Sequence, residues 1–254
     1  MNPQQDLAAA FRALHTPGRP LVLYNVWDAG SAASVARTGA AALATGSWSI
    51  AAAQGYDDGE KISLALMLDV IARIAQTCTP PLTADLEGGY STDAAGVADT
   101  ISQAIAAGVV GCNLEDSEAV SGALRDAFAQ CERLRQARSA ADAACSGFFI
   151  NARTDLFLQA PSPQHDVALA DAALERARAY ADAGADGLFV PGLSDLALIE
   201  RITARSPLPV NVMRLGAAPG IADLASAGVA RISHGPAPYL AAMMALEQAA
   251  TDLR

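Results

Sequence analysis

Eight short apolar runs, each followed by a segment with helical periodicity, constrain the fold of this 254-residue chain more than any other feature. Each run ends in polar, glycine or proline residues, as buried parallel strands do. The expected strands are Leu21–Val26, Ala41–Gly46, Leu82–Glu87, Val109–Glu115, Gly147–Arg153, Asp186–Pro191, Leu208–Met213 and Val229–His234.

The segments between these runs are predicted to be helices. In Gly59–Thr77, for example, apolar residues recur at every fourth position. At four helix-to-strand junctions, "RTGAAAL", "AAGVVGC", "DAGADGL" and "SAGVARI", a glycine closes the helix and an apolar run follows. Eight strand–helix units in series favour a (β/α)₈ barrel over an open, doubly wound sheet. A dinucleotide-binding glycine fingerprint does not follow the first run, where "VWDAGSAAS" stands instead.

Composition sets limits on class and partners. A hydrophobic content of 52% with 17% charged residues suits one well-buried barrel domain over residues 1–254. The formal charge of −10 argues against a nucleic acid or an anionic membrane as partner. Residues 1–11 lack the apolar core of a signal peptide, and a cytoplasmic protein is expected. The four cysteines have no metal-type spacing and are expected to be buried structural thiols, whereas His15 and His165 are expected on the surface.

The segment "TADLEGGY" opens as a strand and closes as a glycine turn. Side chains alternate along a strand, so Asp85 and Glu87 are expected on one side of it. Two carboxylates at the end of an apolar strand repel each other and are costly to desolvate. A hard divalent cation, Mg²⁺ or alternatively Mn²⁺, offsets both effects because it binds carboxylate oxygens and water.

In a barrel, active-site residues lie at the carboxyl ends of the strands. Glu115 ends the strand next to that of Asp85, and Asp58 in "GYDDGE" can reach the same mouth. The four acids Asp58, Asp85, Glu87 and Glu115 therefore suit a Mg²⁺ site in which few ligate directly and others hold the metal's waters. The alternative is that Glu87 begins a turn and Asp58 caps the following helix.

Three further strand ends carry candidate groups. Arg153 can grip a carboxylate or phosphonate, or it can form an internal salt bridge to Glu115 or Asp155. The segment Thr45–Trp48 is either an anion-binding loop of backbone N–H groups or a plain tight turn. His234 is a candidate proton donor or acceptor, although a lone histidine is more often structural.

The motifs "TADLEGGY", "GCNLEDS", "INARTD" and "GADGLFVPG", in this order, resemble the isocitrate lyase/phosphoenolpyruvate mutase superfamily. The resemblance spans nearly the whole chain, from "LYNVWDAGSA" to "GVARISHGP". It is greatest to short members named as phosphonomutase-like, methylisocitrate-lyase-like or oxaloacetate-decarboxylase-like. It implies a (β/α)₈ barrel enzyme that forms homotetramers or dimers, in which the last helix is often swapped between subunits.

The resemblance also implies a substrate and a site. An α-oxo or 2-hydroxy di- or tricarboxylate would be bound with Mg²⁺ and cleaved through a metal-stabilised, pyruvate-type enolate. Asp85 matches the directly ligating residue, and the other three acids match residues that hold the metal through water. The residues expected to contact the substrate are Gly46, Ser47, Trp48, Asp85, Arg153 and Asn211. Those expected to act in catalysis are Arg153, Tyr90 and His234.

Departures from the superfamily pattern leave the reaction open. The lyases carry a Lys-Lys/Arg-Cys-Gly-His loop after the fourth strand, and here residues 117–122 read "SEAVSG". The metal motif is Asp-x-Glu rather than Asp-x-Asp, and Pro191 stands where several members have Glu or His. A carbon–carbon lyase or decarboxylase, with oxaloacetate the best fit, is the first hypothesis. The alternatives are a P–C bond enzyme, either a phosphonopyruvate hydrolase or a mutase, and a carboxylate-binding paralogue with reduced catalysis.

Overall fold

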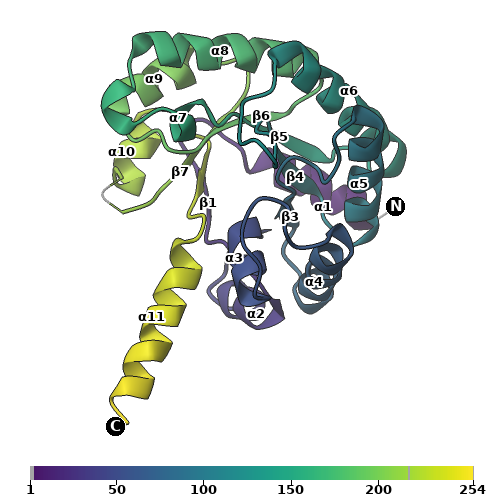
Figure 1. Cartoon of the computed structure of the whole chain (residues 1–254), viewed down its shortest axis with the longest axis vertical. Coiled ribbons are helices and arrows are strands. Elements are labelled where there is room, and N and C mark those ends of the chain that lie inside the picture. Colours follow the sequence, from purple (N-terminus) through teal and green to yellow (C-terminus); the bar gives the residue numbers. More distant parts are fainter. Residues whose placement is uncertain (1–2, 217, 254) are drawn as a thin grey trace.

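The structure, a computed structural model, describes residues 3–216 and 218–253. Eight parallel strands form one curved sheet, and helices pack around its outer face (Figure 1). The strands are β1 (Leu21–Leu23), β2 (Leu43–Ala44), β3 (Leu82–Asp85), β4 (Gly111–Glu115), β5 (Phe149–Arg153), β6 (Gly187–Val190), β7 (Val210–Met213) and β8 (Arg231–Ser233).

The sheet is a nearly closed barrel. The strand order is β1-β8-β7-β6-β5-β4-β3-β2, so that every strand pairs in parallel with a neighbour. Between β1 and β2 the gap is bridged by a parallel pair, Val26 and Thr45, just beyond the two strand ends. All eight apolar runs identified in the sequence contain a strand, and the predicted (β/α)₈ barrel is confirmed.

The helices agree with the sequence less closely than the strands do. They are α1 (Pro3–Ala13), α2 (Ala29–Ala36), α3 (Ser47–Ala53), α4 (Leu64–Thr77), α5 (Ala94–Ala106), α6 (Ala127–Ala144), α7 (Leu156–Gln159), α8 (Val167–Asp182), α9 (Leu196–Arg205), α10 (Ile221–Ser226) and α11 (Ala237–Thr251), with a 3₁₀ turn at Ser162–Gln164.

Two helix boundaries differ from the prediction for local reasons. The helix expected from Gly59 begins at Leu64, because the Ser63 hydroxyl accepts the Leu66 N–H and caps the helix there. The sequence also predicts one long helix over Ser121–Ala144, but α6 begins at Ala127, where Asp126 is the cap. Because Ser63 is the cap of α4, Asp58 does not cap that helix and is part of the loop before it.

Polar side chains fill part of the barrel interior. Asn151 donates to Asn113 at 2.9 Å, and Asn211 exchanges hydrogen bonds with Ser233 at 3.1 and 3.2 Å. Arg231 lies below them and is 1% exposed. The barrel therefore carries a hydrogen-bonded polar layer beneath its carboxyl-terminal mouth.

His15 is not the surface residue that the sequence suggested. It follows α1, and its ring stacks on Phe149 with the centroids 3.9 Å apart. It also meets the edge of Phe11 at 4.8 Å, and its Nδ1 lies 2.9 Å from the Phe11 carbonyl oxygen. Its burial follows from the closure of the barrel's amino-terminal end by α1, which the periodicity of one short helix could not reveal.

The prediction of buried thiols holds for Cys112, Cys131 and Cys145, and Cys78 is partly exposed.

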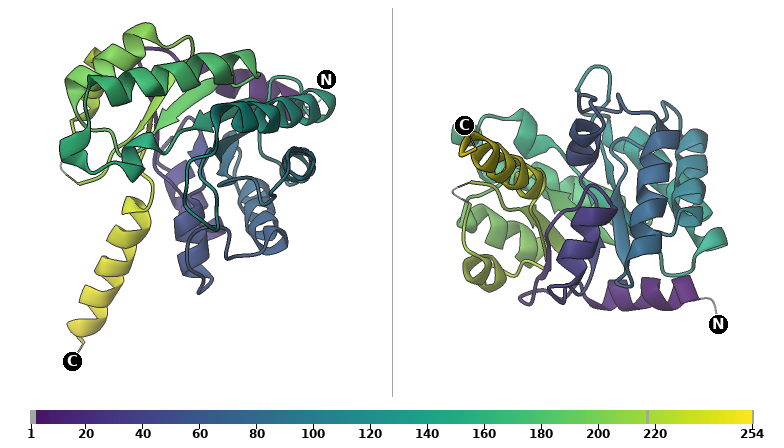
Figure 2. Two further views of the ribbon diagram at one scale, coloured as in Figure 1. Left: turned by 45° about the horizontal axis from the view of Figure 1, so that its top comes forward. Right: turned by 90° about the horizontal axis from the view of Figure 1, so that it is seen from below.

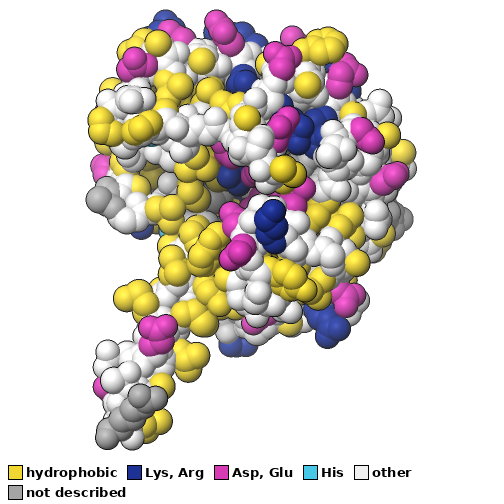
Figure 3. Space-filling view, viewed as in Figure 1, with side chains coloured by type: hydrophobic (Ala, Val, Ile, Leu, Met, Phe, Trp, Pro, Cys, Tyr) yellow, Lys and Arg dark blue, Asp and Glu magenta, His cyan; other side chains and the backbone are white. Residues whose placement is uncertain are grey.

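Helix α11 projects away from the barrel, as Figure 1 and the left view of Figure 2 show. Its apolar side chains Leu240, Met244 and Leu246 are 45–68% exposed. Figure 3 shows acidic side chains near a hollow in the middle of one face, with apolar side chains between the hollow and the projecting helix. Across the described residues, no helix has both the length and the apolar character needed to span a membrane.

Candidate active site

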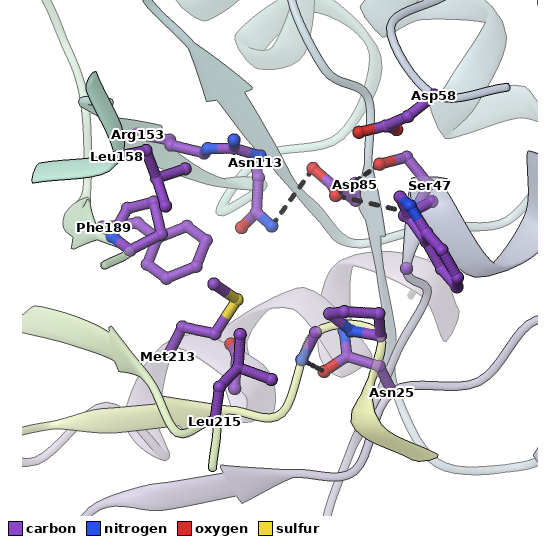
Figure 4. Close-up of a pocket in the computed structure, with 16 residues that line it drawn as sticks. Asn25, Ser47, Asp58, Asp85, Asn113, Arg153, Leu158, Phe189, Met213 and Leu215 are labelled. Carbon is purple, nitrogen blue, oxygen red and sulfur yellow. Dashed lines mark hydrogen bonds between the residues drawn. The ribbon is translucent and has the colours of Figure 1, made fainter. Parts of the chain in front are cut away.

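A cavity at the carboxyl ends of the strands brings together residues from all around the barrel (Figure 4). One part of its lining is polar and the other is apolar. The polar side chains are Asn25, Ser47, Asp58, Asp85, Asn113, Arg153 and Ser233, and the apolar ones include Trp48, Leu158, Phe189, Met213 and Leu215.

Asp85, the last residue of β3, is held at the polar end of this cavity. Its Oδ2 accepts a hydrogen bond from the Ser47 hydroxyl at 2.8 Å, and its Oδ1 lies 3.4 Å from the Asn113 amide nitrogen. The Thr45 hydroxyl accepts the Asp85 backbone N–H at 3.0 Å. Gly46, Ser47 and Trp48 also line the cavity, and Ser47 is the first residue of α3, which the sequence indicated only as a loop or turn.

Glu87 lies just outside the cavity lining. The strand ends at Asp85, and Glu87 has a φ of 50°, so strand alternation does not set its direction. Its carboxylate accepts the Glu60 N–H at 2.7 Å and the Tyr90 hydroxyl at 3.1 Å. Burial, and then the nearby charge of Asp85, raise the pKa of Glu87 to about 7. Glu87 therefore belongs to a buried hydrogen-bonded cluster behind Asp85.

Arg153, at the end of β5, is clamped between two carboxylates. Its Nε and Nη2 donate to the two oxygens of Asp155 at 2.6 and 3.1 Å, and its Nη1 lies 2.7 Å from Glu115 Oε2. Burial alone would lower the Arg153 pKa, but the charges of Glu115 and Asp155 raise it overall. A guanidinium has five N–H donors, and two of those of Arg153 have no partner among the described residues, so they are available to a ligand in the cavity that Arg153 lines. Both interpretations of Arg153 from the sequence, an internal ion pair and a group facing the pocket, are compatible with this geometry.

Asp58 reaches the cavity from the loop after α3. Desolvation, followed by the Asp85 charge, raises its pKa. Burial likewise raises the pKa of Glu115 well above its usual range, against the opposing effect of Arg153. The charged forms of Asp58, Glu87 and Glu115 are thus disfavoured, and a cation beside them would stabilise those forms.

The donor set suits Mg²⁺ only in an open coordination. In the part of the chain that the structure describes, no three His, Cys, Asp or Glu side chains form a ready-made metal cluster. Mg²⁺ commonly keeps several waters and takes one or two carboxylates together with substrate oxygens. Asp85 at the cavity, with Asp58 on a loop and Glu87 and Glu115 behind, fits that pattern.

Besides Glu87 and Glu115, three residues predicted from the sequence do not line the cavity. Asn211 points into the polar barrel layer, where its partner is Ser233. His234 has its Nδ1 3.2 Å from the Leu23 carbonyl oxygen, and burial lowers its pKa. The Tyr90 hydroxyl donates to Glu87, and burial raises its pKa.

Sequence reasoning missed two features of the site. Asp116, 0% exposed, accepts hydrogen bonds from Tyr180 at 2.8 Å and from the Asp155 N–H at 3.0 Å, and so fixes the clamp on Arg153. The apolar part of the lining was also missed, because Leu158 and Phe189 are ordinary helix and strand residues in the sequence. Only the adjacent acids in "LEDS" gave a signal for Asp116.

Comparison with known proteins places the chain in a family. The family model for phosphoenolpyruvate phosphomutase matches residues 11–254. The 2-methylisocitrate lyase of Escherichia coli is 31% identical over 258 residues, covering 96% of this chain and 83% of that protein.

Solved structures agree. A provisionally named phosphonomutase from Burkholderia cenocepacia J2315 is 55% identical, with a TM-score of 0.97 over 99% of this chain and 100% of that one. A phosphonopyruvate hydrolase crystallised with oxalate and Mg²⁺ shares the fold at 22% identity, with a TM-score of 0.85 over 100% of this chain and 87% of that one. The chain is therefore an enzyme of the phosphoenolpyruvate phosphomutase family, within the isocitrate lyase/phosphoenolpyruvate mutase superfamily of lyases and mutases.

Proposed function

We propose that this protein is a Mg²⁺-dependent carbon–carbon lyase acting on an α-oxo or 2-hydroxy acid through a pyruvate-type enolate. The observation that carries the proposal is the position of Asp85. Its carboxylate is oriented by Ser47 and Asn113 at the polar end of a cavity that also holds one arginine. Mg²⁺, or Mn²⁺ in its place, would be held directly by Asp85 and through water by Asp58, Glu87 and Glu115. When bound, the metal supplies Lewis acidity toward the carboxylate and carbonyl oxygens of the substrate.

The chain's own groups would bind and orient the substrate. The two free N–H groups of Arg153 would donate to the substrate carboxylate, with Asp155 and Glu115 fixing the guanidinium plane. Gly46, Ser47 and Trp48 would border the same carboxylate, and Asn211 would act through the polar layer rather than by contact. Tyr90 and His234 do not line the cavity, so we infer that water protonates the enolate carbon. Tyr90 would then hold Glu87, and His234 would support the loop at Asn25.

A homo-oligomer is part of this proposal. The exposed apolar side chains of α11 and its projection from the barrel are costly for an isolated chain. A second copy, with α11 packed against or exchanged with it, would cover them. The light-scattering mass of the purified protein tests this point, and the mass of a single chain would contradict it. A cytoplasmic location and a single domain over residues 1–254 stay predictions.

The test of the metal site is thermal unfolding with and without millimolar Mg²⁺ and oxalate, an analogue of the pyruvate enolate. Ligand at about 100 times its dissociation constant adds about 2.7 kcal/mol to the free energy of unfolding. In a domain of this size that raises Tm by about 5–10 °C. Asp85→Asn should abolish the increase, whereas Asp57→Asn, on the same loop as Asp58 but outside the cavity lining, should retain it. An unchanged increase in Asp85→Asn would overturn the assignment.

Two further assays distinguish the other candidate functions. Phosphate release from phosphonopyruvate would identify P–C bond chemistry. Tight oxalate binding without turnover of any α-oxo or 2-hydroxy acid would identify a carboxylate-binding paralogue with reduced catalysis. Retention of Asp85, Glu87 and Glu115, which are buried or half-buried, favours an active site, because unused buried carboxylates are costly.

A further inference from the structure

The wall of the cavity away from Asp85 is apolar. It consists of Leu158 from α7, Phe189 from β6, Met213 from β7 and Leu215 just beyond it. Figure 4 shows these side chains across the cavity from Asp85, Ser47 and Asp58. A substrate that places its α-oxo carboxylate at the polar end must therefore place most of its remaining atoms against carbon.

Among the residues that the structure describes, that wall carries no second cation. Among the described residues that line the cavity, Arg153 is the only Lys or Arg. It lies at the border of the apolar wall, with its guanidinium carbon 6.0 Å from the centre of the Phe189 ring. Its charge is already matched by Asp155 and Glu115. Asp58, Asp85, Glu87, Glu115 and Asp155 lie in the lining or directly behind it, and these five carboxylates outnumber Arg153 and a bound divalent ion together.

A second substrate carboxylate would thus be desolvated against Phe189, Leu158 and Met213 without a partner. Burying an unpaired charge in this way is strongly unfavourable, whereas burying an alkyl group there is favourable. From this asymmetry we infer the substrate class: a 4-hydroxy-2-oxo monocarboxylate with a short alkyl group on C4. The inference rests on the proposed function and narrows it, away from oxaloacetate and the tricarboxylates.

The corresponding reaction is a retro-aldol cleavage. The C3–C4 bond breaks, and its electron pair moves onto C3 and the C2 carbonyl as an enolate. The C4 hydroxyl loses its proton to water and becomes the carbonyl of an aldehyde. A proton added to C3 then yields pyruvate. The atoms of one substrate equal those of pyruvate and the aldehyde, and no oxidant or co-reactant is needed.

A matched pair of substrates tests the inference. 4-Hydroxy-2-oxopentanoate and 4-hydroxy-2-oxoglutarate differ only by a methyl group or a carboxylate on C4. With saturating Mg²⁺ and a coupled assay for pyruvate, kcat/KM should be at least roughly 100-fold higher for the methyl compound, in line with discrimination by unpaired polar groups. Equal or greater activity on the dicarboxylate, or cleavage of neither, would overturn the inference. Neither result would affect the oxalate-dependent stabilisation that tests the metal site.

A variant of the apolar wall provides an independent check. Leu158 is 46% exposed on the short helix α7, so a longer side chain can be accommodated there. Leu158→Arg supplies the missing cation and should shift the preference at least tenfold toward the dicarboxylate. Leu158→Gln has a polar side chain without the charge and should not shift it toward the dicarboxylate. If the ratio of kcat/KM for the two substrates were the same in wild type and Leu158→Arg, this wall would not be the determinant of substrate preference.

Discussion

Acidification below pH 6.5 should destabilise this protein through His15. The imidazole stacks on Phe149 and faces the edge of Phe11, and its Nδ1–H donates to the Phe11 carbonyl oxygen at 2.9 Å. The Nε2 atom is buried with no partner among the described residues. Burial, and next the positive charge of Arg231, lower the pKa of His15 from 6.5 to about 3.

The sign of the effect follows from proton uptake. The unfolded chain binds a proton at His15 near pH 6.5, whereas the folded protein resists it until about pH 3. Stability from the neutral ring is therefore complete above pH 6.5 and is lost as the pH falls below that value. With about 1.36 kcal/mol for each pKa unit, the loss between pH 7.5 and pH 5 is about 2 kcal/mol.

The assay is urea unfolding of wild type and His15→Gln at several pH values between 7.5 and 5. Titrating carboxylates contribute equally to both proteins, so they cancel in the difference between the two free energies of unfolding. Wild type should be the more stable at pH 7.5, and its advantage should shrink by about 2 kcal/mol at pH 5. A difference that stays constant across this range would refute the reasoning, because it would mean that the ring takes up a proton equally in both states.

Three further substitutions probe the barrel. Gly187→Ala should destabilise by about 1–3 kcal/mol in urea unfolding, because its Cβ would lie 2.7 Å from Asn151 Oδ1 and 2.9 Å from a Phe149 ring carbon; a neutral result would contradict this packing. Arg231→Met should be neutral or stabilising, since the buried guanidinium has two unpartnered nitrogens among the described residues, and it should weaken the pH dependence assigned to His15. Arg153→Met should destabilise by about 3–5 kcal/mol because Glu115 and Asp155 lose their partner; a loss below 1 kcal/mol would indicate a solvated ion pair.

The sequence was sufficient for the barrel because each strand is a separate apolar run bounded by polar or glycine residues. All eight runs were predicted longer than the strands they contain because they include flanking residues, and β2 is only Leu43–Ala44. The helix α3 was missed because it begins directly after Gly46, where a glycine and two serines resemble a turn. Helix starts depended on caps such as Ser63, which periodicity alone does not reveal.

Residues of the candidate site could be predicted where they end a strand, as Asp85 and Arg153 do. Glu87 could not be placed, since strand alternation stops at Asp85 and the positive φ of Glu87 depends on its contacts with Glu60 and Tyr90. The apolar wall was beyond sequence reasoning for a different reason. Its members come from separate elements, and each is typical of a core residue until the barrel brings them to one cavity.

The direct ligation of a divalent cation by Asp85 is the central claim, and anomalous diffraction from crystals grown with Mn²⁺ and oxalate tests it most directly. The predicted result is one anomalous peak per chain in the cavity, bound to the Asp85 carboxylate and to oxalate. Water should separate that peak from Asp58, Glu87 and Glu115. A peak bound directly to Glu87 or Glu115, or one lying outside this cavity, would contradict the account.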